Sequence, residues 1–253
     1  MSTLRSPCDD GAADGWALMA GPTGTPPPVE LGGRSFERTL VQTHLIHIKE
    51  PLEPLLDSQV RPLLEQGDWV AISEKVVAIS EGRVVHFSVV RPGPLAKLIV
   101  KGTRKYEHDV AFSDPRKMQV AIMQTGSTRA AFAMVVGGVT KLFGRHGDFY
   151  RIAGHRIAEI DGFNPDTVAP FNEFAMLGPA DPDKACAAYA RFLGHPVVII
   201  DGNNINVEVL GMSPDMPVDK ASARLILLDN PMGQGDELTP FVIVHPVGGP
   251  GGK

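Results

Sequence analysis

The fold is decided by the stretch Gly67-Asp-Trp-Val-Ala-Ile-Ser-Glu-Lys-Val-Val-Ala-Ile-Ser-Glu-Gly-Arg83. Its first part, Asp68 to Val77, is rich in β-branched and aromatic residues and predicts a strand. The polar residues Ser73-Glu74-Lys75 interrupt that strand. They form either its alternating solvent face or the edge at which it meets a nucleotide site, and the pattern alone leaves both interpretations open. Glu81-Gly82-Arg83 predicts a turn into a further strand at Val84-Val85.

The residues before this stretch predict an earlier strand and a helix. Apolar residues recur at helical spacing from Leu52 to Leu64, and Gly67 follows as a natural end to the helix. Thr43-His-Leu-Ile-His-Ile48 predicts the first strand of the ordered chain. His44 and His47 resemble a metal-binding pair, but residues three apart on a strand point to opposite faces. We therefore expect no metal there.

The residues after this stretch predict three helices, each begun by an aspartate, and two strands. The helices span Asp114 to Gly126, Asp181 to Gly194 and about Asp219 to Leu228. Val197-Val-Ile-Ile200 predicts a buried strand and Phe241-Val-Ile-Val-His245 the last one. The elements alternate irregularly, and the sequence has neither a G-x-x-x-x-G-K-[ST] loop nor a G-x-G-x-x-G turn. It therefore gives no support to the usual nucleotide-binding folds.

Composition indicates an ordinary globular protein. Of its residues 43% are hydrophobic and 21% charged, and the net charge is −5. This gives no electrostatic reason to expect nucleic acid or an anionic membrane as a partner. The apolar run from Ala130 to Val139 is half the roughly 20 residues of a membrane-spanning helix. The N-terminus lacks a secretory signal, so we expect a cytoplasmic protein whose Cys8 and Cys186 are more readily thiols than a disulfide.

The domain organisation follows from composition. Residues 1–34 are rich in Gly, Pro, Ala and Asp and predict a disordered extension. Residues 35–246 form the globular domain, and residues 247–253 a flexible tail.

Three segments carry oxygen ligands at the ends of predicted elements: Ile160-Asp-Gly-Phe-Asn164, Asp201-Gly-Asn-Asn204 and Asp229-Asn-Pro-Met-Gly-Gln-Gly-Asp-Glu-Leu-Thr-Pro240. Taken alone, Asp161 or Asp201 fits a structural turn, a salt bridge or a metal ligand. Together the segments offer carboxylates and amides without a cysteine or a well-placed histidine. That donor set favours Mg²⁺ or Mn²⁺ over zinc. The glycines around Gln234 permit close backbone approach to a ligand.

The sequence resembles the coenzyme F420-0:γ-glutamyl ligase family. The likeness rests on the stretch from Gly67 to Arg83, on Ile160-Asp-Gly-Phe-Asn164, on Val198-Ile-Ile-Asp201 and on Met232-Gly-Gln-Gly-Asp-Glu237, in the family's order. It spans about residues 38–245. The resemblance implies an α+β fold that forms an intertwined homodimer. It also implies a ligase that uses GTP, Mg²⁺ or Mn²⁺ and a monovalent cation, K⁺, to join L-glutamate to a carboxylate acceptor, F420-0 or an analogue, through an acyl phosphate.

The resemblance also implies roles for particular residues. Asp161, Asp201 and Gln234 match the family's metal-binding positions. Its nucleotide-binding positions correspond to Glu74, Lys75, Asn164, Gly233, Gln234, Gly235, Asp236 and Glu237.

Three features depart from the family. Ile79 stands where a lysine is usual, Gly202 follows Asp201 where a hydroxyl residue is usual, and residues 130–156 are atypical. These departures leave the acceptor open between F420-0 and a related carboxylate. A nucleotide- and metal-binding protein without ligase activity is the alternative interpretation, and a metal-dependent phosphohydrolase is a weaker third.

Overall fold

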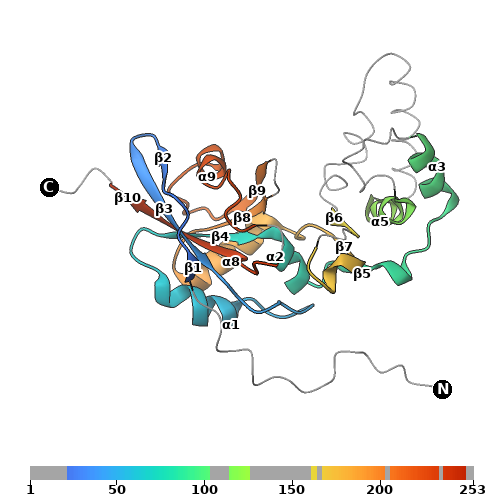
Figure 1. The fold of residues 1–253 in the computed structure, drawn as a ribbon, viewed down its shortest axis with the longest axis horizontal. Coiled ribbons are helices and arrows are strands. Elements are labelled where there is room, and N and C mark those ends of the chain that lie inside the picture. Colours follow the sequence, from blue (N-terminus) through green and yellow to red (C-terminus); the bar gives the residue numbers. More distant parts are fainter. Residues whose placement is uncertain are drawn as a thin grey trace, which may run out of the picture.

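The structure is a computed structural model that describes residues 22–102, 114–125, 161–163, 167–202, 206–233 and 236–248. A larger sheet forms one lobe, and a smaller sheet with helices α3 and α5 forms the other (Figure 1). Helices and strands are mixed without a βαβ rhythm, as expected for an α+β protein.

The larger sheet has the strand order β1-β3-β10-β4-β8-β9, with β2 also pairing with β3. Its strands are β1 Pro22–Gly24, β2 Val29–Leu31, β3 Arg34–Val41, β4 Trp69–Ser73, β8 Val197–Gly202, β9 Val207–Met212 and β10 Phe241–Val247. Of the described pairs in this sheet, β4 and β8 are parallel and the others antiparallel. The parallel pair brings the C-terminal ends of β4 and β8 to the same edge of the sheet.

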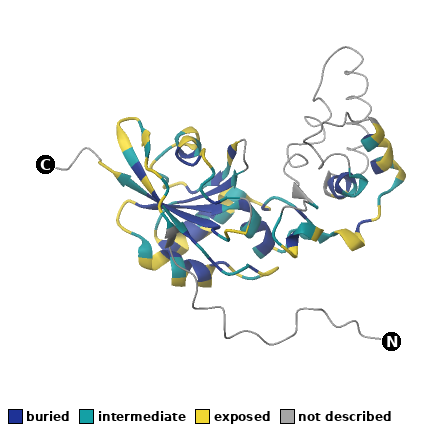
Figure 2. Ribbon diagram, in the orientation of Figure 1, coloured by how far each residue is buried: buried dark blue, intermediate teal, exposed yellow. Residues whose placement is uncertain are grey.

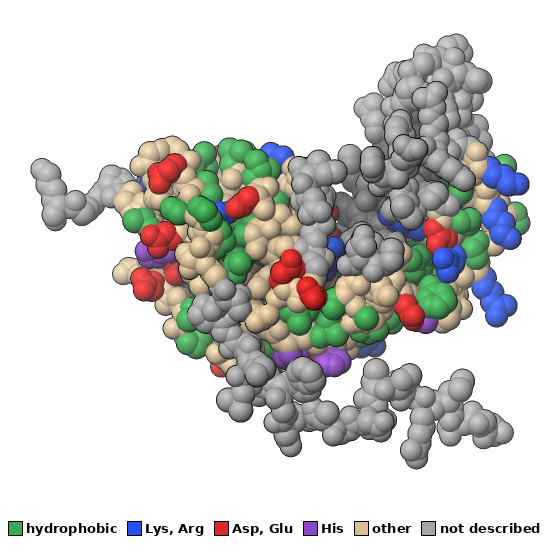
Figure 3. All heavy atoms as spheres, viewed as in Figure 1, with side chains coloured by type: hydrophobic (Ala, Val, Ile, Leu, Met, Phe, Trp, Pro, Cys, Tyr) green, Lys and Arg blue, Asp and Glu red, His purple; other side chains and the backbone are tan. Residues whose placement is uncertain are grey.

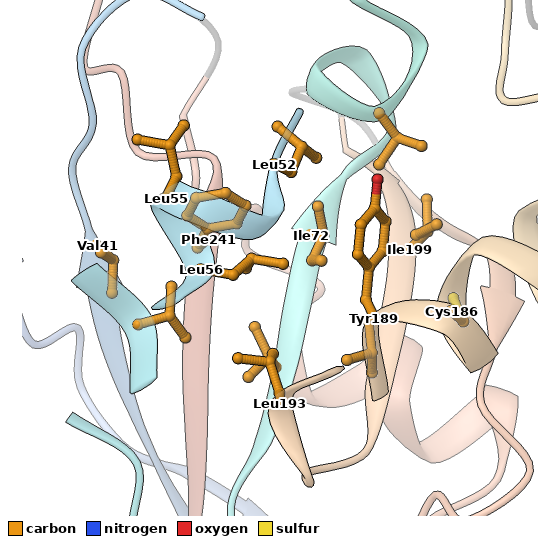
Figure 4. Close-up of a cluster of buried hydrophobic side chains, with 14 of the residues drawn as sticks. Val41, Leu52, Leu55, Leu56, Ile72, Cys186, Tyr189, Leu193, Ile199 and Phe241 are labelled. Atoms are coloured by element: carbon orange, nitrogen blue, oxygen red, sulfur yellow. The ribbon is translucent and has the colours of Figure 1, made fainter. Parts of the chain in front are cut away.

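Both faces of the central strands are buried, which explains their continuous apolar sequence (Figure 2). Along β4 and β8, alternate residues enter two different cores. Figure 4 shows the first core, in which Leu52, Leu56 and Tyr189 cover Ile72 and Ile199. The second core lies against α9 (Lys220–Ile226) on the other face and contains Trp69, Ala71, Val198, Ile200, Ile226 and Leu227.

The helices begin at the predicted caps. Asp181 accepts a hydrogen bond from the Lys184 backbone N–H at the start of α8 (Pro182–Leu193), which Gly194 ends with φ +76°. Asp219 caps α9 by accepting from the Ser222 backbone N–H at 2.7 Å. In the same way Asp114 caps α5 (Pro115–Thr125). Gly126 lies outside the described residues.

The smaller sheet has the order β5-β7-β6, formed by Val84–His86, Phe174–Met176 and Asp161–Gly162. The turn predicted before Val84 is confirmed, with Gly82 at φ +68°. Helices α3 (Pro94–Gly102) and α5 pack against each other beside this sheet and bury Ile99, Met118 and Ile122 among others. Short 3₁₀ turns occur at Phe87–Val89 and Phe171–Glu173. Lys and Arg side chains gather on this lobe near α3. Asp and Glu side chains are scattered, mostly over the larger lobe (Figure 3).

Two strand predictions were wrong in their extent. The predicted strand from Asp68 to Val77 ends at Ser73, and α2 (Glu74–Ser80) begins there. Residues 43–48 form no strand. The first long strand is β3, and it ends before this segment, at Val41. The helical prediction for residues 52–64 holds, although the segment divides into α1 Glu53–Leu55, a π turn at Leu56–Val60 and a 3₁₀ turn at Arg61–Leu63.

Part of the N-terminal segment predicted to be disordered is ordered. β1 and β2 both pair with β3, through Pro22↔Val41 and Val29↔Phe36. The Pro27 carbonyl also accepts a hydrogen bond from Arg38 at 2.6 Å. The globular part thus includes residues 22–34. No helix among the described residues has the length and apolar character needed to cross a membrane.

Candidate active site

The candidate site is a pocket at the edge where β4 and β8 end. The pair aligns Ser73 with Ile200, so the next residue on each chain segment, Glu74 at the start of α2 and Asp201 near the end of β8, lies at the same edge of the sheet. Five separate segments line the pocket: 43–46, 73–79, 167–176, 201–202 and 230–240. The pocket therefore depends on the assembled sheet.

Glu74 and Lys75 enter the pocket lining from the first turn of α2. Glu74 is 5% exposed, although glutamate is rarely buried without a compensating interaction. The change from strand to helix at Ser73 is what turns both side chains to the end of the sheet. Of the two interpretations of Ser73-Glu74-Lys75, the structure excludes the alternating solvent face.

Asp201 and Gly202 reach the pocket at the end of β8, where Gly202 contacts the loop after α9. A Cβ atom on Gly202 would lie 2.3 Å from Oδ1 of Asn230. Asn230 has φ +46°, and its Nδ2 donates to the Gly233 carbonyl at 3.2 Å. Gly233 has φ +74° and packs against the carboxylate of Glu237. Glycine is thus required at both positions. At 202 a side chain would collide with Asn230, and at 233 the backbone has a positive φ that other residues rarely adopt.

The end of this loop is fixed by hydrogen bonds to its neighbours. The Leu238 carbonyl accepts from the Thr43 backbone N–H at 2.8 Å, and the Pro240 carbonyl from Ser73 N–H at 2.9 Å. The Thr239 hydroxyl donates to the Met232 carbonyl at 2.8 Å. The loop therefore leads directly into β10 and is held by hydrogen bonds to the sheet edge next to Glu74.

The structure brings five of the predicted site residues together in one pocket lining: Glu74, Lys75, Asp201, Gly233 and Glu237. Asp236 is exposed in the same loop but does not line the pocket.

The remaining predicted site residues are described in part or not at all. The backbone of Asp161 pairs with Met176, a residue of the pocket lining. The structure does not describe the Asp161 side chain. Asn164, Gln234 and Gly235 lie outside the described residues, as does the predicted apolar run of residues 130–150.

The sequence did not single out several residues that line the pocket, among them Thr43, Thr167 and Asn230, and it considered His44 only as half of a rejected metal pair. The expectation of no well-placed histidine was wrong, because His44 is one of them. Ile79 is 4% exposed and also contributes to the lining. The prediction of a strand at residues 43–48 gave no reason to expect Thr43 and His44 in the pocket.

The carboxylates in the pocket suit a hard divalent cation. Glu74, Asp201 and Glu237 all line it, and Lys75 is the lysine among the lining residues. Several carboxylates around one cavity repel one another unless a cation neutralises them. Oxygen donors of this kind are those that Mg²⁺ and Mn²⁺ prefer.

Comparison with known proteins places the chain in a family. A comparison with curated protein sequences gives no match. A family model described as F420-0:Gamma-glutamyl ligase matches residues 41–200, more than half of the chain. The match includes Glu74 and Lys75 and ends one residue before Asp201, so the loop with Gly233 and Glu237 lies beyond it. The chain belongs to the F420-0:gamma-glutamyl ligase family, and this membership implies a ligase.

Proposed function

We propose that this protein is a metal- and GTP-dependent γ-glutamyl ligase that joins L-glutamate to a carboxylate acceptor, F420-0 or an analogue. The observation that carries the proposal is the convergence of Glu74, Lys75, Asp201, Gly233 and Glu237 on one pocket in a chain of this family. We also propose that it acts in the cytoplasm as a homodimer, with K⁺ as an additional cofactor.

The proposed reaction has two steps. An oxygen of the acceptor carboxylate attacks the γ-phosphorus of GTP, which forms an acyl phosphate and releases GDP. The glutamate amine then attacks the acyl carbon, forms the amide and releases phosphate, and the amine loses a proton. Phosphoryl transfer of this kind depends mainly on positioning and on charge neutralisation rather than on covalent catalysis by the protein.

The pocket residues have separate roles in this proposal. Asp201, with Asp161, Gln234 and Glu237, would hold Mg²⁺ or Mn²⁺, which supplies positive charge next to the phosphates. The Lys75 ammonium would pair with a phosphate oxygen. Gly233 would allow the backbone of the loop to approach the nucleotide, because glycine has no side chain and readily adopts the positive φ found here.

The proposal is tested with the full-length protein, GTP, Mn²⁺, F420-0 and L-glutamate. We expect a product heavier by one glutamyl residue, with phosphate released in equal amount and only when both acceptor and glutamate are present. Asp201→Asn should lower turnover by about 100-fold or more, because it removes a charged metal ligand. Glu208→Gln is the matched control. Glu208 is paired with Asp201 across β8 and β9 but does not line the pocket.

Three outcomes contradict the proposal. Full turnover in Asp201→Asn would exclude Asp201 as a metal ligand. Tight GTP binding without phosphate release under any acceptor would indicate a binding protein without ligase activity. Phosphate release that needs neither acceptor nor amine would indicate a phosphohydrolase.

A further inference from the structure

Beside this pocket, His44, His47 and Glu50 form a compact group on the segment between β3 and α1. Their potential ligand atoms all lie within 4.8 Å of one another. His44 Nε2 is 2.7 Å from Glu50 Oε1, and His47 Nδ1 is 3.2 Å from Glu50 Oε2. The two imidazole rings lie 6.1 Å apart by centroid. One carboxylate is thus placed between two histidines.

The backbone of this segment is fixed at several points. The Thr43 N–H donates to the Leu238 carbonyl at 2.8 Å, and the Lys49 N–H to the Ile79 carbonyl at 2.9 Å. Next to Lys49, which has φ +67°, the Glu50 N–H donates to the His47 carbonyl at 3.0 Å. Ile46 is buried in the main core. The arrangement of the three side chains is therefore set by the fold before any ion binds.

The carboxylate of Glu50 is positioned by the same turn. Its Oε2 accepts a hydrogen bond from the His47 backbone N–H at 2.7 Å. This backbone contact helps to hold the carboxylate between the two imidazole rings.

The spacing of the group matches a transition-metal site. Zinc binds histidine nitrogen and carboxylate oxygen at roughly 2.0–2.2 Å in a tetrahedron, so its ligand atoms lie about 3.4 Å apart. His44 lies 2.7 Å from one Glu50 oxygen and His47 lies 3.2 Å from the other. The three ligand atoms all lie within 4.8 Å of one another, so a bound ion would draw them closer together. Two imidazoles and a carboxylate form a donor set that zinc and related transition metals use, unlike the all-oxygen set preferred by Mg²⁺.

Other histidines pair with carboxylates without such convergence. His86 contacts Glu173 at 3.0 Å, and His245 contacts Asp68 at 2.5 Å. Each is one histidine with one carboxylate, a common way to fix a loop. Among the described residues, the group at 44–50 is where three metal-ligating side chains meet.

We propose that His44, His47 and Glu50 bind one divalent transition-metal ion, of which Zn²⁺ is the natural probe, at the edge of the pocket. This is a second metal site, distinct in donor chemistry from the carboxylate site at Asp201. His44 belongs to both the group and the pocket lining, whereas the His47 side chain is 75% exposed. Three protein ligands leave a fourth position for water or for an anionic group bound in the pocket.

The test is a calorimetric titration of Zn²⁺ into full-length protein that has been treated with chelator and then supplied with a large excess of Mg²⁺. The Mg²⁺ occupies the oxygen-ligand site, so the signal reports the histidine site. We expect one Zn²⁺ per chain. His47→Gln should weaken Zn²⁺ binding by at least about 10-fold, the lower end of what altering a metal site costs in affinity. X-ray absorption should show two imidazole ligands in the wild type and one in the variant.

Two variants separate the site from general effects on folding. His47 is mostly exposed, so His47→Gln should keep the wild-type melting temperature and the wild-type affinity for Mg²⁺ and GTP. His86→Gln removes a histidine of similar pairing outside the group and should leave Zn²⁺ binding unchanged. The proposal is overturned if wild type takes up no Zn²⁺ under Mg²⁺, or if His47→Gln and His44→Gln both bind it as tightly as wild type. Neither result would alter the proposed ligase activity, which is measured separately.

Discussion

The side chain of Asn230 occupies the space that a Cβ atom on Gly202 would need, with Asn230 Oδ1 only 2.3 Å from that position. The end of β8 and the loop after α9 therefore pack closely against each other because residue 202 has no side chain. The absence of a side chain at position 202 is what allows Asn230 to approach this closely.

Gly202→Ser should force Asn230 out of place, because the contact is shorter than van der Waals distance. We expect a loss of about 1–3 kcal/mol in the free energy of unfolding, typical of overpacking, together with weaker GTP binding. The double variant Gly202→Ser, Asn230→Gly should recover much of the stability, since glycine tolerates the positive φ of residue 230. Urea denaturation of the three proteins measures this. Equal free energies of unfolding for Gly202→Ser and wild type would show that the loop carrying Asn230 can move aside without loss of stability.

Asp229→Ala should destabilise the protein strongly. Arg38 is 1% exposed and donates to Asp229, to the Ile226 carbonyl and to Pro27. Without Asp229 the buried guanidinium loses its counter-charge. Because the Asp229 side chain is 52% exposed and water can partly replace it, we expect a loss of about 1.5–3 kcal/mol, the contribution of a hydrogen bond to a charged group. The matched control is Asp57→Ala at the exposed Asp57–Arg61 pair, where the expected loss is below about 1 kcal/mol. Thermal and urea unfolding should give clearly different values for the two variants.

Lys75→Met should raise the KM for GTP by about 10-fold or more while the fold is kept. The methionine preserves the apolar stem but removes the charge, and a hydrogen bond to a charged group contributes about 1.5–3 kcal/mol. Lys97→Met on α3 removes an exposed lysine that does not line the pocket and should leave the KM unchanged. Steady-state kinetics at several GTP concentrations separate the two. An unchanged KM in Lys75→Met would remove Lys75 from the phosphate site.

Cys186 should resist alkylation in the folded protein. Burial raises the pKa of its thiol to about 12, so very little thiolate exists near neutral pH. The side chain is also inaccessible, at 0% exposure. We expect iodoacetamide at pH 8 to leave Cys186 unmodified in the native protein and to modify it fully in guanidinium chloride, as shown by peptide mass spectrometry. Rapid native labelling would mean that α8 separates from the sheet in solution.

The elements best predicted from sequence are those fixed by local signals. The span of α8 follows from Asp181, Pro182 and Gly194, each of which acts on its nearest neighbours. The helix at Glu74 was missed because Val76, Val77 and Ile79 favour a strand locally. Their burial against the main core decides otherwise.

The limits of the site prediction also have a physical cause. Asp201 was predictable because a polar residue follows a buried apolar strand. The long strand β3 was missed because Arg38 occupies a core-facing position. Arg38 is tolerated there through Asp229, which is 191 residues away in sequence. The group at His44 was missed for the related reason that an irregular segment was taken for a strand.

The position of β10 has a consequence for how the chain folds during synthesis. This last strand lies between β3 and β4 and pairs with both, so β3 and β4 are joined in the sheet only through β10. During synthesis on the ribosome, the complete sheet can form only after nearly the whole chain has been made. Such pairing across long sequence separation slows folding. A ribosome stalled before Phe241 should therefore hold a nascent chain that a protease cuts readily between β3 and β4.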